Sequence, residues 1–232
     1  MTDSLNVYDS NTVNSQNPLA RFAHRSRMQR YLKYLVPRLE NREGKMLDYG
    51  CGSGFLISQL LAVKPYSVFG YEPVLTDRTT ENLPISPDLE TIRKNAPYHT
   101  ITCFEVMEHL QWKENAKILS ICRELLTEHG ELIVSVPIEI GPAVLFKEMN
   151  RFRIYRKWRY RFVEFIATTL FGVPGTRPTP DLDYQPHKGF DFRDLIKFFK
   201  SKSWKVSVLC YSPLPTGVWY GNSQVFLRAK PL

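Results

Sequence analysis

Short apolar runs alternate with amphipathic stretches along most of this chain. Runs of apolar and β-branched residues stand at 45–49, 67–71, 98–104 and 131–136. Segments whose apolar residues recur every three or four positions lie at 17–39, 55–61 and 113–127. In the first of these, Phe22, Met28, Leu32 and Leu35 are expected to pack while the basic residues face out. Buried strands that alternate with amphipathic helices are typical of α/β proteins with a mainly parallel sheet. We therefore expect a doubly wound sheet with helices on both faces.

The carboxyl-terminal part follows a different order. After a loop at 185–191, residues 192–201 are expected to form the last helix, and 205–211 with 223–228 a closing antiparallel hairpin. Residues 74–97 carry three prolines and no clear helical period, so we expect an irregular unit there with an extended piece near 83–86.

A helical insertion is expected after the fifth strand, over residues 141–180. Apolar and aromatic residues recur there at spacings of three or four, and lysines and arginines fill the gaps between them. The recurring residues are Leu145, Met149, Phe152, Tyr155, Trp158, Phe162 and Phe165. This pattern predicts an amphipathic helix, or two joined ones, with aromatics on one side and cations on the other.

The length and the composition of the chain fit one domain of ordinary size. The chain has 232 residues, of which 43% are hydrophobic, and we expect a single domain over 17–232 after a polar arm at 1–16. The four cysteines are isolated, which favours free thiols in a reducing cytoplasm. Neither an apolar leader nor a run of about 20 apolar residues is present. These features predict a cytoplasmic protein.

The net charge of +8 is concentrated in the insertion. Seven cations stand between Lys147 and Arg161 against Glu148 alone, so this segment carries +6 of the total. Three interpretations stay open for residues 145–165. The first is a cap over a substrate crevice, and the second, compatible with it, is contact with an anionic membrane that leaves the protein peripheral to its inner face. Nucleic-acid binding is third, because the cations fall on one short element with no known binding motif.

A glycine loop follows the first strand. Gly50, Gly52 and Gly54 stand at alternate positions between that strand and the helix at 55–61, where they allow a sharp turn and close approach of a ligand. Glu72 stands at the end of the next strand, about 20 residues further on. An acid at that distance is placed to accept hydrogen bonds from both hydroxyls of a ribose. The sequence thus predicts a nucleotide-type pocket.

Three segments carry a resemblance to a known family. Asp48 to Gly54 resembles motif I of class I S-adenosylmethionine-dependent methyltransferases, and Glu72 matches their ribose-binding acid. Cys103 to Leu110 resembles the segment after their fourth strand, and Gly130 to Pro137 their fifth strand. The resemblance covers about 17–140 and 185–229. It implies a Rossmann-like α/β fold: a seven-stranded, mainly parallel sheet with a carboxyl-terminal antiparallel hairpin.

The resemblance also implies S-adenosyl-L-methionine as the cofactor and a set of residues that bind it. The side chain of Arg27 or of His24 is expected to pair with the carboxylate of the cofactor's methionine moiety. A solvated basic face of the helix explains either residue equally well. Asp88 and Leu89 are expected at the adenine, although Asp88 equally suits a turn cap. The full cofactor set is Arg27, Asp48, Gly50, Cys51, Gly52, Gly54, Glu72, Pro73, Asp88, Leu89 and Glu105.

Methyl transfer to oxygen or nitrogen benefits from a general base. The candidate catalytic residues are His187, Glu105 and His109, with Asp183 as a further candidate base. His187 is preferred because it stands in the loop expected to roof the acceptor site.

Glu105, Glu108 and His109 also resemble a segment of ubiquinone-biosynthesis O-methyltransferases, in which such residues have been linked to a divalent metal. No metal is assigned here, because the Glu-His pair also occurs in methyltransferases without one. The more basic and aromatic insertion of this chain argues against a quinone precursor as acceptor, and methyltransferases of saccharide and natural-product pathways are the other resemblance.

The expected activity is methyl transfer to a small-molecule, glycan or lipid-linked acceptor, with oxygen as the expected acceptor atom. An inactive protein that binds S-adenosylmethionine, or a membrane surface through the basic helix, is the alternative. A nicotinamide-dependent oxidoreductase is a weaker alternative, since its loop reads G-x-G-x-x-G where this one reads G-x-G-x-G. The sequence makes no prediction about oligomeric state.

Overall fold

The structure is a computed structural model that describes residues 18–40, 44–63, 67–74, 83–177, 187–214 and 216–232. The expected arm at 1–16 and the candidate base Asp183 lie outside these residues. No helix among the described residues is both long and apolar enough to cross a membrane.

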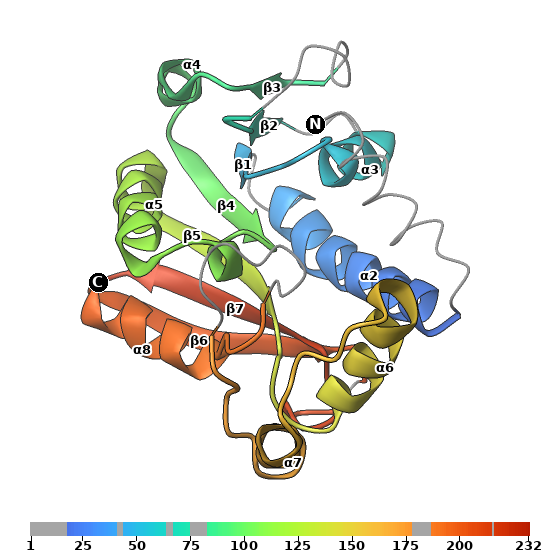
Figure 1. Cartoon of the computed structure of the whole chain (residues 1–232). Coiled ribbons are helices and arrows are strands. Elements are labelled where there is room, and N and C mark those ends of the chain that lie inside the picture. The colour runs from blue at the N-terminus through green and yellow to red at the C-terminus, as the bar shows by residue number, and fades with distance from the viewer. Residues whose placement is uncertain (1–17, 41–43, 64–66, 75–82, 178–186, 215) are drawn as a thin grey trace.

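Seven strands form one sheet (Figure 1). They are β1 Met46–Tyr49, β2 Val68–Tyr71, β3 Ile85–Ser86, β4 Tyr98–Phe104, β5 Leu126–Pro137, β6 Trp204–Ser212 and β7 Gln224–Pro231. Their order is β3-β2-β1-β4-β5-β7-β6, with β1 to β5 parallel and β7 antiparallel to both neighbours. The chain reverses its direction of winding between β1 and β4, which is where ligands bind in open α/β sheets. The expected fold is confirmed.

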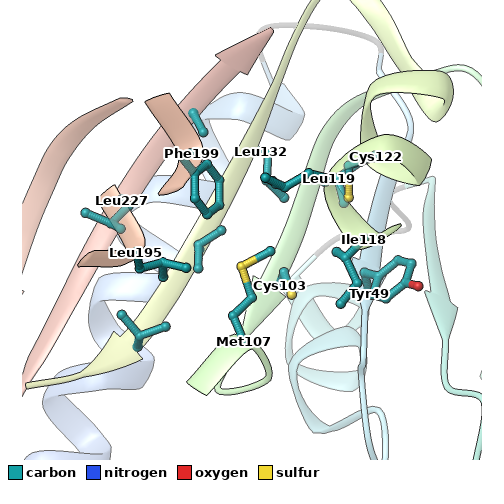
Figure 2. Close-up of a cluster of buried hydrophobic side chains, with 14 of the residues drawn as sticks. Tyr49, Cys103, Met107, Ile118, Leu119, Cys122, Leu132, Leu195, Phe199 and Leu227 are labelled. Carbon is teal, nitrogen blue, oxygen red and sulfur yellow. The ribbon is translucent and has the colours of Figure 1, made fainter. Parts of the chain in front are cut away.

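Helices cover both faces of the sheet. They are α2 Pro18–Glu40, α3 Phe55–Val63, α4 Leu89–Lys94, η1 Met107–His109, α5 Trp112–Leu125, α6 Ala143–Tyr155, α7 Phe162–Phe171 and α8 Phe192–Ser201. One core cluster joins α2 and α3 to the sheet, and a second joins α4, α5 and α8 to its other face. Figure 2 shows the second cluster, in which Cys103 and Met107 lie between Ile118 and Cys122 of α5 and Leu195 and Phe199 of α8.

Helix α2 packs on the sheet through a stripe that includes Tyr31, Leu35 and Leu39, all less than 9% exposed. Phe22 was expected to share in this packing, and that expectation is wrong, because its side chain is 55% exposed. Phe22 precedes Met28 by six residues, which places it about 240° around the helix and off the buried stripe.

Two boundaries differ from the sequence prediction. Helix α4 was not predicted; its first turn is capped by Asp88, whose carboxylate accepts hydrogen bonds from the N–H groups of Glu90 and Thr91 at 3.1 and 3.0 Å. Helix α5 ends at Leu125 instead of Thr127, because Leu126 is extended and already pairs with Tyr98 of β4. Strand β5 is therefore longer than the predicted 131–136.

The insertion forms two helices, α6 and α7, as expected. Its cations do not all face solvent, and that part of the prediction is wrong. Lys147, Arg151 and Arg159 contact the buried carboxylates of Glu139 and Glu148. Lys147 Nζ lies 2.9 Å from Glu139 Oε1, and Arg151 Nη1 lies 3.0 Å from Glu139 Oε2. We call these five residues the ion cluster. Removing such cations from water is costly unless each is paired with an opposite charge.

Candidate active site at the carboxyl ends of the strands

The glycine loop lies directly after β1. Gly50, Gly52 and Gly54 have φ angles of 77°, 53° and 75°, in the left-handed region that favours glycine. A Cβ at Gly54 would stand 2.5 Å from Ile85 Cδ1, whereas a Cβ at Gly52 would meet no described atom within 4 Å. The loop is therefore packed from behind at Gly54 and open at Gly52, which leaves the backbone at Gly52 accessible to a ligand.

Glu72 lies against this open part of the loop. Its Oε2 accepts a hydrogen bond from the N–H of Gly52 at 2.9 Å, and its Oε1 accepts one from Val74 at 3.2 Å. Each carboxylate oxygen has two lone pairs, so both retain capacity for a further donor. The structure thus brings together the two features that predicted a nucleotide-type pocket.

Asp48 and Cys51 turn toward the protein interior. The Asp48 carboxylate is buried and accepts a hydrogen bond from Thr102 Oγ1 at 2.6 Å. Burial raises its pKa to about 6, although the Thr102 hydrogen bond acts in the opposite direction. The Cys51 thiol packs near Gly70 of β2, and burial raises its pKa above the usual range. A contact of Cys51 with the cofactor would therefore use its backbone.

Three further candidates for cofactor binding, Asp88, Leu89 and Pro73, lie near the ends of β3 and β2. Asp88 caps α4, so the cap interpretation accounts for its orientation, and its hydrogen bonds lower its pKa. Leu89 is half-buried against the core under α4, and Pro73 is exposed. Contacts of these residues with an adenine stay a prediction.

Arg27 and Glu105 pair with each other. Arg27 Nη1 donates to Glu105 Oε2 at 3.1 Å, and Ser135 and Gln224 donate to Oε1 of the same carboxylate. Glu105 follows β4 directly and has a φ of 57°, a conformation that costs a non-glycine residue about 1 kcal/mol. Arg27 was expected at the methionine moiety of the cofactor, and Glu105 was expected among the cofactor-binding and catalytic residues. Arg27 reaches this area, but a cofactor carboxylate has to compete with Glu105 for it. The side chain of His24 is not among the described parts of the structure.

Glu108 is the most unusual carboxylate of the site. Its side chain is fully buried, and neither oxygen accepts a hydrogen bond within the described part of the chain. Burial, together with the charge of Glu105, raises its pKa well above the ordinary value. An ionised buried carboxylate without a donor is costly, so Glu108 takes up a proton unless a ligand, an ion or water completes its surroundings.

His109 and His187 face this carboxylate from two distant segments. His187 Nδ1 lies 3.8 Å and His109 Nε2 lies 4.0 Å from Glu108 Oε1, and the two imidazole centroids are 4.5 Å apart. Burial lowers the pKa of His187 to about 3 and also lowers that of His109. Both rings are therefore neutral at pH 7, with lone pairs available for a proton, a donor or a metal.

These three residues fit a divalent cation better than the set suggested by the sequence. One atom from each of Glu108, His109 and His187 lies within 4.8 Å of the other two. Tetrahedral sites with bonds of about 2.1 Å need separations of about 3.4 Å, which small side-chain rotations supply. Glu105, in contrast, already has three donors. An orphaned carboxylate and two neutral imidazoles make a suitable ligand set for a borderline metal.

The insertion and its flanks contribute residues that sequence reasoning missed. Arg177 donates to the backbone oxygen of Glu108 at 3.2 Å, and Gln224 reaches Glu105 from β7. Glu139 of the ion cluster lies close enough to His187 for its charge to act on that imidazole. The sequence could have pointed to Glu139, because it stands three residues after the predicted fifth strand. Side chains at that edge of a parallel sheet line the ligand crevice.

Comparisons with known proteins show the family to which the chain belongs. Residues 20–171 match the model of the methyltransferase domain family. The chain belongs to this family. It is therefore a methyltransferase, the expected dependence on S-adenosylmethionine is confirmed at the level of the family, and the nicotinamide alternative is disfavoured. A search of curated protein sequences gave no significant match.

Solved structures with the same fold are distant in sequence. A methyltransferase from Archaeoglobus fulgidus is 12% identical, with a TM-score of 0.58 and coverage of 97% of this chain and 99% of that one. A possible histamine N-methyltransferase from Thermotoga maritima is 15% identical, with a TM-score of 0.57 and coverage of 98% and 96%. Magnesium protoporphyrin IX methyltransferase from Synechocystis with bound SAH is 12% identical, with a TM-score of 0.53 and coverage of 100% and 95%. These likenesses support the methyltransferase fold.

Proposed function

We propose that this protein transfers a methyl group from S-adenosylmethionine to an oxygen atom of a small-molecule, glycan or lipid-linked acceptor. The observation that carries the proposal is the contact of Glu72 with the Gly52 amide beside an open part of the glycine loop. A similar fold has been solved with bound SAM, which is consistent with this donor. An anionic membrane, contacted through residues 145–165, is the second proposed partner.

The donor is proposed to lie across the ends of β1, β2 and β4. Glu72 holds the ribose hydroxyls through its remaining lone pairs, and the amides of Gly52 and its neighbours face the donor. Asp88 and Leu89 lie on the adenine side. Arg27 leaves Glu105 to pair with the methionine carboxylate, an exchange of one anionic partner for another.

The acceptor is proposed to bind between the donor and the pair His109–His187. The acceptor oxygen attacks the methyl carbon in line, the C–S bond breaks, and S-adenosylhomocysteine leaves as a neutral thioether. The hydroxyl proton becomes strongly acidic as the new C–O bond forms. His187, although a weak base with a pKa near 3, then suffices to take it.

Glu108, His109 and His187 would hold a divalent metal. Such an ion acts as a Lewis acid that polarises the acceptor oxygen and lowers its pKa. Glu108 Oε1 lies 3.8 Å from His187 Nδ1, so a small rotation of either side chain would form a hydrogen bond that orients the imidazole.

Calorimetry tests the donor assignment. We expect binding heat with S-adenosylmethionine and S-adenosylhomocysteine and none with NAD. Glu72→Ala should weaken binding at least about tenfold, because hydrogen bonds to a charged group contribute about 1.5–3 kcal/mol each. The matched control is Glu128→Ala, an exposed glutamate at the start of β5. Unchanged affinity in Glu72→Ala would remove the ribose assignment.

A second measurement separates the enzyme from an inactive binding protein. Radiolabelled methyl donor is incubated with the protein and either the water-soluble or the polar-lipid extract of cells. Label that moves into one fraction identifies the acceptor class. Donor binding without transfer to either fraction favours the inactive alternative.

A further inference from the structure

We infer that the outer faces of α6 and α7 form a docking surface for an anionic membrane, and the inference does not depend on the proposed methyl transfer. Ten of the 19 large apolar side chains that are exposed in the described residues lie between Leu145 and Val173. This short segment therefore carries more than half of the exposed apolar side chains. Monomeric soluble proteins rarely expose so many together unless they form an interaction site.

The apolar side chains follow helical spacing on both helices. On α6, Leu145, Met149 and Phe152 are four and three residues apart and lie on one face. On α7, Phe162, Val163, Leu170 and Phe171 are between 55% and 78% exposed. The sequence pattern predicted such a face, and the structure leaves it uncovered by any described residue.

Aromatic contacts join the two helices into one surface. The ring of Phe152 on α6 lies 6.2 Å, centroid to centroid, from that of Trp158 in the connection. Trp158 in turn lies 5.0 Å from Phe165 on α7, and both Phe152 and Trp158 stay more than 40% exposed. Figure 1 shows both helices at the periphery of the molecule, with α7 at its lower end. We define the membrane surface as the exposed apolar residues Leu145, Phe146, Met149, Phe152, Trp158, Phe162, Val163, Leu170 and Phe171.

Exposed cations stand in the same segment as this surface, and residues 143–163 contain no exposed acid. Arg153, Arg156, Lys157 and Arg161 are exposed between the two helices. The one acid between 143 and 163, Glu148, is buried in the ion cluster. The cations of the insertion therefore fall into two groups. Lys147, Arg151 and Arg159 pair with the buried carboxylates of the ion cluster, and the other four cations are exposed to solvent in the same segment as the apolar residues.

This arrangement favours a membrane over other occupants. Exposed aromatic and aliphatic side chains enter the boundary between headgroups and acyl chains, and flanking Arg and Lys contact anionic headgroups. A second copy of the chain would bring two groups of exposed cations together, which repels the copies. Nucleic acid would leave Phe162, Val163 and Phe171 in water.

The inner side of the same helices lies over the candidate active site. Lys147 and Glu139 place α6 near His187, and Arg177, shortly after α7, contacts the backbone of Glu108. Docking through the outer side would thus hold the acceptor crevice close to the membrane, a position that suits a lipid-linked acceptor.

Vesicle flotation of the full chain tests the inference. Vesicles of phosphatidylcholine with about one-third phosphatidylglycerol are compared with vesicles of phosphatidylcholine alone. We expect recovery with the anionic vesicles, lost at high salt. Arg153→Gln/Arg156→Asn should lower the partition coefficient about 25-fold, since each cation near an anionic surface contributes about fivefold. Phe162→Ser/Val163→Ser should lower it at least about tenfold, from the lost apolar burial.

Matched controls lie elsewhere on the molecule. Lys113→Gln/Lys117→Gln removes two exposed cations from α5, and Val63→Ser/Val218→Ser removes two exposed apolar side chains. Both control variants should float as the wild type does. Equal recovery on neutral and anionic vesicles, absence of binding, or wild-type binding by either surface variant would overturn the inference.

Light scattering with size exclusion distinguishes a contact between copies of the chain. A wild-type dimer that becomes a monomer in Phe162→Ser/Val163→Ser, without vesicle binding by either, would show that the surface joins two chains and would also overturn the inference. A monomeric wild type that binds vesicles supports it.

Discussion

Nδ1 of His187 lies 3.8 Å from Oε1 of Glu108, although one residue precedes α8 and the other lies in η1 after β4. His109 joins them at 4.0 Å. The fold thus brings a buried carboxylate without a described donor together with two neutral imidazoles, beside the proposed donor pocket. We propose that the convergence of these side chains is the structural basis for the acceptor chemistry.

Removal of one member of this group should weaken divalent-metal binding. Titration of the metal-free protein with Mn²⁺, followed by electron paramagnetic resonance, should show one site. Glu108→Gln and His187→Gln should each weaken it at least about tenfold, because even residues that support a ligand contribute 10- to 100-fold to affinity. His129→Gln, at an exposed position on β5, is the matched control. Identical affinity in all four proteins would exclude this ligand set.

The glycine loop offers a second prediction, because its glycines differ in their surroundings. Gly54→Ala should unfold the protein at lower urea concentration, since its Cβ would stand 2.5 Å from Ile85 and 2.7 Å from Leu83. Gly52→Ala should cost only about 1 kcal/mol of stability, the penalty for a left-handed alanine. Its methyl group, however, enters the proposed donor site, so affinity for S-adenosylmethionine should fall at least about tenfold, a loss comparable to one hydrogen bond to a charged group.

Gly217→Ala is the control, because a Cβ there meets nothing within 4 Å and lies far in sequence from the loop. It should leave both stability and donor affinity unchanged. Wild-type donor affinity in Gly52→Ala would show that the donor does not approach this amide.

The sheet could be predicted from sequence because its signals are local. Apolar runs of β-branched residues, glycines at strand ends and Asp48 to Gly54 each report on a few neighbouring positions, and the seven-stranded sheet with its closing hairpin followed from the resemblance. Helix α4 was missed because prolines hid its pattern, although Asp88 followed by Glu90 is a capping signal. Phe22 was misplaced because its spacing relative to Met28 was not considered.

The site could be predicted only in part, since its contacts join distant segments. Glu72 and the loop were found because their spacing is characteristic of nucleotide pockets. The partner of Arg27 was not found, because nothing in the sequence brings α2 over Glu105. The charges of the insertion were misjudged for the same reason. Glu139 precedes the basic run, and its burial with Lys147 and Arg151 depends on the tertiary fold.

The ion cluster leads to a prediction about stability. Arg159 is buried to 1% exposure of its side chain and pairs with Glu148, which is equally buried. Glu148→Gln keeps the shape but leaves Arg159 with less compensating charge, so we expect a loss of about 3 kcal/mol in the free energy of unfolding. Urea denaturation at pH 7 measures it.

Glu124→Gln is the matched control, because it removes one charge from an exposed pair with Arg93. Exposed pairs contribute little to stability, so this variant should unfold with the wild type. A loss in Glu148→Gln no greater than that in Glu124→Gln would mean that the cluster is open to water.

Asp48 provides a prediction about pH. Burial raises its pKa to about 6 in the folded protein, against 3.8 in an unfolded chain. Between these values the unfolded state releases its proton first, so stability should fall as pH rises from about 4 to about 6. The shift corresponds to about 3 kcal/mol of stability, which is fully present below about pH 4 and fully lost above about pH 6.

Asp48→Asn isolates this effect, because asparagine does not titrate and its side-chain oxygen still accepts from Thr102. Urea denaturation of the cofactor-free protein at pH 4 and pH 7 should show that the variant gains about 3 kcal/mol relative to the wild type between the two. Asp194→Asn, at an exposed position on α8, should show no such gain. A constant difference between Asp48→Asn and wild type across this range would mean that the carboxylate is already ionised in the folded protein at pH 4, and that water or another donor reaches it inside the sheet.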